Sequence, residues 1–380
     1  MAERTSRQSN IELLRIFCAL GVVILHYNNT SLGGGFNFVD SSSINELIMV
    51  FFESLFMCVV NIYVLISGYF LKNSTNIDLL KPVKLFSMYV IFELLAYLIK
   101  ELPKGAPFSF KTFLGYFTPN YWFLFLYIAL FLLSPFLSLM WNHMGKTGKK
   151  ALLIILIVLF SVYPFAWDVI NNVTKYTLWN APSVNGLMQG ISTISLFGAD
   201  RGYTLVNFIL MFVIGLYIRD KVEEGKKANT ITLLILLIIN TELIVAWTYA
   251  DYFITGYLLP STICWSYDNP LIILEAVLFF LFFINLKIKD NKIINTLATA
   301  AFPTYLIHIN LLQYLQIERF VKSNPLVMTV HMLCSMVLLF LISFVIYKAY
   351  ELLTKPLFKA ISGKWQKCRY ITAGKETSNK

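Results

Sequence analysis

Long apolar runs alternate with short polar segments along almost the whole chain. A helix needs about 20 apolar residues to cross the hydrocarbon core of a membrane, and each of these runs comes near that length. The pattern therefore predicts an all-α, polytopic membrane protein with about ten transmembrane helices. The runs are 10–29, 47–71, 83–100, 121–140, 151–167, 203–219, 230–249, 270–287, 297–316 and 326–350.

Two of the expected helix starts carry local signals. Ser9 and Glu12 have the spacing of a capping box at the start of the first helix. Pro82 fits the first turn of the third, where its missing N–H leaves no bond unmade. We expect the first helix to be retained, because residues 1–10 are polar and no small-residue cleavage site follows the run.

The composition supports a membrane protein. Hydrophobic residues make up 57% of the 380 positions and charged residues 14%, and the mean hydropathy is +0.67. A soluble protein would carry roughly 25% charged residues. The five cysteines are scattered, with neither a CxxC pair nor a cluster of metal-ligand spacing, so we expect no metal site.

The basic residues predict the orientation of the helices. If the N-terminus is cytoplasmic, 23 of the 31 Lys and Arg residues fall in cytoplasmic segments. This bias favours a protein of the cell (inner or plasma) membrane with both termini inside. It also makes the net charge of +10 a feature of topology, and we expect no nucleic acid partner. The predicted organisation is a cytoplasmic tail, 1–9, a membrane domain, 10–350, and a basic cytoplasmic tail, 351–380.

Aromatic residues gather in the segments expected outside the cell, above all in 249–268. Tyrosine and tryptophan commonly anchor helix ends at the membrane surface, and Trp122 fits that role. Flat aromatic rings can also serve as platforms for sugar rings, and the sequence leaves both interpretations open.

An arginine and a histidine share one face of the first helix. The 11 residues from Arg15 to His26 make three turns plus about 20°, so the two side chains lie on one stripe about 16 Å apart along the axis. Glu12 lies one turn from Arg15, at a spacing that permits an ion pair. Such groups are costly against lipid, so they must face protein or water. A snorkelling cation and an interhelix contact are the simplest explanations of Arg15 and His26.

Further ionisable residues lie at depths near that of His26 in other predicted helices. Several polar groups at similar depth favour a shared cavity, and Glu53, Glu242 or Glu275 could orient the imidazole of His26. The ionisable residues at these depths are Glu53, Glu93, Glu242, Glu275, His308 and His331.

The chain resembles the acyltransferase 3 family of bacterial integral-membrane acyltransferases, which O-acetylate surface polysaccharides. The Arg-x10-His signature of that family matches Arg15 and His26, and its Ser-Gly-Tyr motif matches ISGYFL at 66–71. The segment FPTYLIHINLL, which contains Tyr305 and His308, also resembles the family. The usual Arg-x-x-Arg pattern is replaced by Lys81 and Lys84, which keeps the charge but loses the bidentate geometry of arginine.

The resemblance implies transfer of an acyl group, in the first place acetyl from cytosolic acetyl-CoA, to a hydroxyl of an extracytoplasmic or lipid-linked polysaccharide. Arg15, Lys81 and Lys84 would then bind the phosphates of the acyl-CoA co-substrate, and no tightly bound cofactor is expected. His26 would act as a general base or carry the acyl group transiently. Expected partners are acyl-CoA, the sugar acceptor and membrane lipid.

Other motif residues have competing explanations. Ser67 and Gly68 favour close helix packing over chemistry, and Tyr69 completes their motif. For His308, a packing hydrogen bond and a role at the acceptor or donor site remain equal alternatives.

Two other classes of protein also bury ionisable residues. A secondary transporter or flippase of a polysaccharide precursor would fit ten helices, but no inverted repeat and no matched pair of Gly/Pro breaks is visible. A polysaccharide-assembly scaffold with an inactive site is the third possibility.

Overall fold

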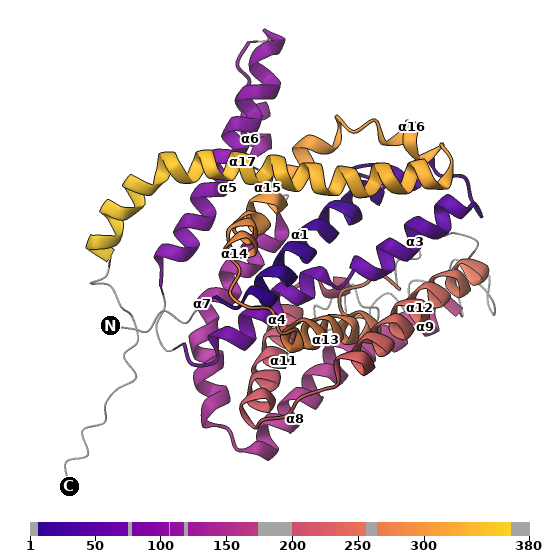
Figure 1. The fold of residues 1–380 in the computed structure, drawn as a ribbon, viewed down its shortest axis with the longest axis vertical. Helices are drawn as coiled ribbons and strands as arrows, with labels where there is room; N and C mark the ends of the chain where they lie inside the picture. Colours follow the sequence, from indigo (N-terminus) through magenta and orange to yellow (C-terminus); the bar gives the residue numbers. More distant parts are fainter. Residues whose placement is uncertain are drawn as a thin grey trace.

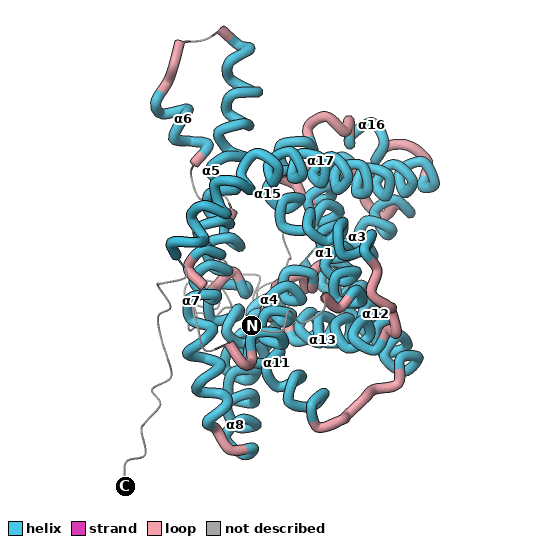
Figure 2. The backbone as a smooth tube through the Cα atoms, turned by 60° about the vertical axis from the view of Figure 1, so that its left-hand side comes forward, coloured by secondary structure: helices cyan, strands magenta, loops and turns pink. Residues whose placement is uncertain are grey.

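The computed structural model describes residues 7–74, 78–105, 107–117, 121–173, 200–255 and 264–365. These residues form helices and loops, without a strand among them (Figures 1 and 2). Every apolar run predicted to span contains helix. Within the described ranges, seven helices are long and apolar enough to cross a membrane. The chain is therefore an all-α, multi-pass membrane protein.

Most of the predicted spans correspond to one helix, and three correspond to a pair. The helices on these spans are α1 (Ser9–Asn28), α3 (Ile44–Phe56) with α4 (Val59–Leu71), α5 (Leu80–Glu101), α7 (Trp122–His143), α8 (Lys146–Ile157) with α9 (Tyr163–Val173), α11 (Leu205–Glu223), α12 (Thr230–Thr255), α13 (Pro270–Asn285), a 3-10 turn (Ala298–Ala300) with α15 (Ala301–Leu312), and α17 (Pro325–Trp365). Short helices lie between them: α2 (Gly35–Phe38), α6 (Phe110–Tyr116), α14 (Lys292–Leu297) and α16 (Ile317–Val321).

Local departures from the predicted spans have structural causes. The second run is divided at Met57 and Cys58, so α3 and α4 are two helices of 13 residues each. One turn of π-helix, Val158–Val162, joins α8 to α9. The last helix has 41 residues and continues to Trp365, through the first part of the predicted basic tail. The rest of that tail, 366–380, and residues 1–6 of the N-terminal tail lie outside the described residues.

The predicted capping box at the start of α1 is wrong. Gln8 occupies the cap position without a side-chain hydrogen bond, and Ser9 is the first residue of the helix. The Ser9 hydroxyl instead donates to Asn295 Oδ1 at 2.9 Å and accepts from the Asn291 backbone N–H at 2.8 Å. Glu12 binds Arg15. Tertiary contacts with the start of α14 therefore engage Ser9, and an ion pair within α1 engages Glu12.

Helices α4 and α11 approach each other closely at two glycines. A Cβ on Gly68 would overlap the backbone carbonyl of Phe212, and a Cβ on Gly215 would overlap that of Leu65. Small residues permit this approach between membrane helices. The structure thus gives Gly68 a packing role. Tyr69 next to it is buried, with its ring 5.2 Å from that of Phe280 on α13.

Helix α1 lies in the middle of the bundle, where it contacts α3, α4, α13, α15 and α17. Ala19 of α1 packs in one buried cluster with Ala300, Ala301 and Phe340. These small side chains bring the beginning of α15 close to α1. Helices α5 and α6 extend from the bundle as a projecting hairpin (Figures 1 and 2). Because α1 is surrounded in this way, the face that carries Arg15 and His26 is enclosed by other helices.

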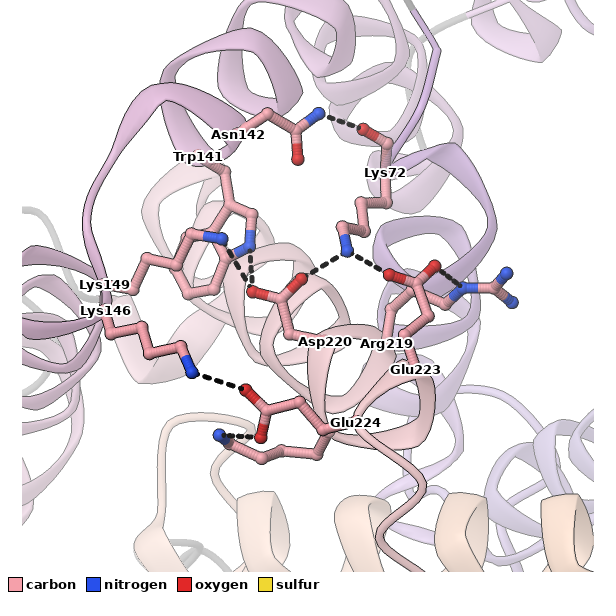
Figure 3. Close-up of polar contacts among 10 residues, drawn as sticks. Lys72, Trp141, Asn142, Lys146, Lys149, Arg219, Asp220, Glu223 and Glu224 are labelled. Carbon is pink, nitrogen blue, oxygen red and sulfur yellow. Dashed lines mark hydrogen bonds and ion pairs between the residues drawn. The ribbon is translucent and has the colours of Figure 1, made fainter.

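Ion pairs join the ends of α4, α8 and α11 in a cluster around Asp220 (Figure 3). Lys72 pairs with both Asp220 and Glu223, and Lys149 donates to Asp220 Oδ2 at 2.8 Å. The Trp141 indole N–H donates to the same oxygen at 3.1 Å. Asp220 lies just beyond the predicted span 203–219. Burial would raise the pKa of this carboxyl, but the hydrogen bonds from Lys149 and Lys72 outweigh burial and hold the pKa below its usual value.

Candidate active site

A cavity of about 1,020 Å³ runs between α1, α4, α5, α7 and α15, and we call it the central cavity. Both charged positions of the first-helix stripe, Arg15 and His26, line it. The structure therefore confirms that the two side chains face one shared space. Helix α5 follows the cavity lengthwise, from Lys81 in its first turn to Lys100 in its last, and these two residues name the two ends.

The Lys81 end is basic and rich in hydroxyl groups. Lys81 Nζ lies 4.4 Å from the ring centroid of Phe131 and 5.8 Å from that of Tyr127. The hydroxyls of Ser67 and Tyr127 are 3.3 Å apart. Arg15, Ser67, Lys81 and Tyr127 all line the cavity here. Two cations beside several hydroxyl groups form a suitable environment for an anionic ligand.

Arg15 lies at the cavity wall and forms one ion pair, which leaves part of its guanidinium available. Its Nη1 lies 3.1 Å from Glu12 Oε1, as the helical spacing predicted, and its side chain remains 37% exposed. The backbone carbonyl of Arg15 accepts a hydrogen bond from the Tyr63 hydroxyl at 3.0 Å. A guanidinium carries five N–H donors, so one ion pair leaves donors available to a ligand.

His26 meets a second histidine across the interface between α1 and α15. Its Nδ1 is hydrogen-bonded to Nε2 of His308. The two rings are nearly parallel, at 10°, and their centroids are 4.7 Å apart. His308 is fully buried, and its Nδ1 lies 2.7 Å from the Thr304 carbonyl oxygen of its own helix.

The hydrogen bonds assign the ring protons of the neutral histidine pair. A carbonyl oxygen can only accept, so Nδ1 of His308 carries a proton and Nε2 of the same ring is the acceptor. Nδ1 of His26 must then be the donor to His308. The remaining nitrogen, Nε2 of His26, keeps its lone pair, and no residue in the described part of the chain bonds to it. The arrangement provides an oriented base at the cavity wall.

The Lys100 end combines a carboxylate, a cation and an amide. Lys100 Nζ donates to Asn310 Oδ1 at 2.6 Å, which links α5 to α15. Glu93 lies two turns before Lys100 on the same stripe of α5 and is 5% exposed. Thr112 and Tyr116 of the projecting hairpin complete this end of the cavity.

Three aromatic residues from distant segments form another part of the cavity wall. The ring centroids of Trp122 and Tyr203 are 4.6 Å apart, those of Trp122 and Tyr267 5.6 Å, and those of Tyr203 and Tyr267 4.9 Å. Trp122 is thus partly buried and belongs to an aromatic group that lines the cavity. Tyr257, in the aromatic segment 249–268, lies outside the described residues.

Several residues proposed from the sequence lie away from the central cavity. Lys84 is exposed, with Nζ 5.4 Å from the ring centroid of Phe358. Glu53 accepts from Asn28 at 3.0 Å, and Glu275 accepts from Thr241 at 2.6 Å. Glu242 is exposed on α12. The partner of His26 in the structure is His308, and none of these three glutamates lines the cavity.

Some cavity residues carry no sequence signal that would single them out. Tyr63, Tyr121 and Tyr127 look like ordinary aromatic residues of apolar helices, and only the folded structure groups them. In the sequence, Lys100 is a basic residue at the end of the predicted span 83–100, with nothing that indicates a site. Asn310 follows the motif histidine by two positions, and that proximity is the one hint at its place.

Comparison with known proteins identifies one family. A family model described as an acyltransferase domain matches residues 8–348, nearly the whole chain. Neither the curated proteins nor the solved structures contain a significant match to the chain.

Proposed function

Because this chain belongs to the acyltransferase 3 family, we propose that it is a membrane-bound O-acyltransferase that moves acetyl from acetyl-CoA to a hydroxyl of a surface or lipid-linked polysaccharide. The observation that carries the proposal is the central cavity. It holds the cations of its Lys81 end and the oriented Nε2 of His26 in one continuous space.

The distribution of basic residues supports a cytoplasmic position for the Lys81 end. Lys72, Lys81 and Lys149 belong to segments that the positive-inside rule assigns to that side. Acetyl-CoA is a cytosolic metabolite, so the donor would enter from this end. The acceptor would approach from the Lys100 end, on the extracytoplasmic side of the cell membrane.

The Lys81 end has the chemistry to hold the donor. Arg15 and Lys81 supply N–H donors for phosphate oxygens, and Tyr127 and Ser67 add hydroxyls. The pantetheine arm is long and slim, and the stripe from Arg15 to His26 spans about 16 Å along α1. A donor anchored by its phosphates at Arg15 can therefore bring its thioester to His26.

His26 would act as the general base for the transfer. Nε2 removes the proton from the acceptor hydroxyl, whose oxygen forms a bond to the thioester carbonyl carbon. The carbon–sulfur bond then breaks, and the coenzyme A thiolate takes the proton from the imidazolium. His308 stabilises the charged ring because its Nε2 accepts from Nδ1 of His26. A transient acyl group on Nε2 of His26 would need the same orientation.

A transfer assay with the purified protein tests the proposal. The protein in lipid nanodiscs is mixed with radiolabelled acetyl-CoA and surface polysaccharide from which base has removed existing esters. We expect label on the polysaccharide with the wild type and none with His26→Ala. The matched control is His331→Ala, because His331 bonds to Tyr27 and does not line the central cavity. Equal labelling by wild type and His26→Ala would contradict the assigned role of His26.

The same assay separates an enzyme from a transporter. A transporter or flippase would leave the polysaccharide unlabelled in every sample, although acetyl-CoA and the wild-type protein are present. The family assignment favours the enzyme, because the matched model describes an acyltransferase domain.

A further inference from the structure

The Lys100 end of the central cavity contains polar groups that the proposed transfer chemistry does not use. Glu93, Lys100 and Asn310 come from two helices and face the same part of the cavity. Glu93 and Lys100 belong to α5, whose last turns form with α6 the hairpin that projects from the bundle in Figure 2. We propose that these three residues form an acceptor subsite that binds a hydroxylated sugar unit. The proposal rests on the proposed function.

Glu93 carries an unmet hydrogen bond inside the protein. Its side chain is 95% buried, and Oε1 has no hydrogen-bond partner within the described part of the chain. The neighbouring Tyr121 hydroxyl has a single proton, which it donates to the Leu306 carbonyl oxygen at 3.0 Å. Buried polar atoms in native proteins nearly always have partners, and the exceptions require an explanation. A ligand that donates a hydrogen bond to Glu93 provides one.

Lys100 and Asn310 offer hydrogen-bond donors, so they require a ligand that accepts hydrogen bonds. Lys100 can only donate, and one of its three protons is used by Asn310. The amide N–H groups of Asn310 also donate. A ligand at this end must therefore both donate to Glu93 and accept from Lys100 or Asn310. Hydroxyl groups do both, and the neighbouring hydroxyls of a sugar ring offer several within a few ångströms.

The charges favour a neutral or weakly charged sugar over an anionic one. One carboxylate and one ammonium lie on the same stripe of α5, two turns apart, which is about 10 Å along the helix. Their opposite charges leave the end without the excess of cations found at the Lys81 end. The two ends of the cavity thus differ in the ligand that each can hold: phosphates at one and hydroxyls at the other.

Residues of the projecting hairpin form one wall of the subsite. Thr112 and Tyr116 of the projecting hairpin line the cavity next to Lys100. Tyr116 is fixed by a hydrogen bond from its hydroxyl to Glu101 Oε1 at 2.9 Å.

Steady-state kinetics of the purified protein in nanodiscs test the subsite. The acceptor probe is a set of oligosaccharides from mild hydrolysis of base-treated surface polysaccharide, and the donor is radiolabelled acetyl-CoA. We expect Glu93→Leu and Lys100→Met each to raise the KM for the oligosaccharides by about tenfold or more, since a hydrogen bond to a charged group is lost. The KM for acetyl-CoA should stay unchanged. Glu93→Gln keeps an acceptor oxygen, so it should raise the KM for the oligosaccharides less than Glu93→Leu does.

A buried glutamate elsewhere gives the matched control. Glu275→Gln changes a fully buried carboxyl that bonds to Thr241 and does not line the cavity, so both KM values should stay near wild type. If the wild type labels the oligosaccharides but the Glu93 and Lys100 variants keep its acceptor KM, the subsite is wrong and the acyltransferase proposal stands. If the wild type transfers no label, the proposed function fails, and the subsite with it.

Discussion

His26 and His308 lie 282 positions apart in the sequence, and their imidazole rings share a hydrogen bond in the centre of the helical bundle. The carbonyl oxygen of Thr304 fixes the proton on the far side of His308. A backbone acceptor and a second histidine thus orient His26. In many enzymes a carboxylate, and not a second histidine, orients the catalytic histidine.

We predict that His308→Leu lowers kcat by about 10²-fold to 10⁴-fold, the range that general-base catalysis contributes. The KM for acetyl-CoA should change little, because His308 does not contact the Lys81 end. His308→Gln should recover part of the rate, since its amide oxygen can accept from Nδ1 of His26. The measurement is the kcat and KM of purified variants across a pH series. A His308→Leu enzyme with the wild-type kcat and pH profile would exclude a positioning role.

Arg15 is predicted to bind the donor. Arg15→Ala should weaken acetyl-CoA binding by about tenfold or more, because charge-assisted hydrogen bonds to phosphate are lost. Lys81→Ala should weaken binding in the same direction. Lys84→Ala is the matched control, since Lys84 is exposed and does not line the central cavity. Isothermal titration with acetyl-CoA measures the dissociation constants of all three variants. If all three equal the wild-type value, Arg15 and Lys81 do not belong to the donor site.

The cluster around Asp220 is predicted to stabilise the fold in a pH-dependent way. The pKa values of Asp220 and Glu223 are both lowered. At Asp220 burial would raise the pKa, but the hydrogen bonds from Lys149 and Lys72 outweigh it. At Glu223 the largest cause is the hydrogen bond from Lys72. Stability from a lowered carboxyl pKa is present above the unfolded value and is lost as the pH falls through the folded one. Thermal stability should therefore decline below about pH 4.

Asp220→Asn tests that cluster directly. The substitution removes the charge that faces Lys72 and Lys149, and we expect a loss of about 2 kcal/mol at neutral pH. The decline below pH 4 should also become shallower. Thermal unfolding in detergent across a pH series measures both effects. An Asp220→Asn protein with the wild-type pH profile would show that the cluster contributes nothing to stability.

The contact between α4 and α11 should tolerate no side chain at Gly68. Gly68→Ala places a methyl group against the Phe212 backbone carbonyl, so the helices must separate, at a cost of about 1–3 kcal/mol. The control is Gly145→Ala, where an added Cβ meets nothing within 4 Å. Thermal stability should fall only in the Gly68 variant. Equal melting temperatures would mean that the helices adjust without strain.

The sequence predicts the helices well because the hydrophobic periodicity of a membrane span is strong and long-ranged. It also predicts the Arg15–His26 stripe and the Glu12 pair, because these relationships lie within one helix. The capping box failed for a related reason. A local motif at Ser9 competes with tertiary contacts from α14, and local spacing contains no information about that competition.

The partner of His26 depends on contacts between helices distant in sequence. From depth alone, Glu53, Glu242 and Glu275 were equivalent candidates to orient His26, because depth along a helix does not say which face turns inward. The small residues Ala19, Ala300 and Ala301 decide the matter by bringing α15 against α1. Glu93 and Lys100 illustrate the same limit, because their spacing puts them on one stripe of α5 but only the packing of α5 turns that stripe toward the cavity.

The most direct test of the central claim is the O-acetyl content of surface polysaccharide purified from cells. Proton NMR compares cells that carry the wild type, His26→Ala, His331→Ala or no copy of the gene. We predict acetyl signals with the wild type and His331→Ala and none in the other two samples, with all proteins present at equal levels. Identical spectra from all four samples would contradict the account of this chain as a polysaccharide O-acetyltransferase.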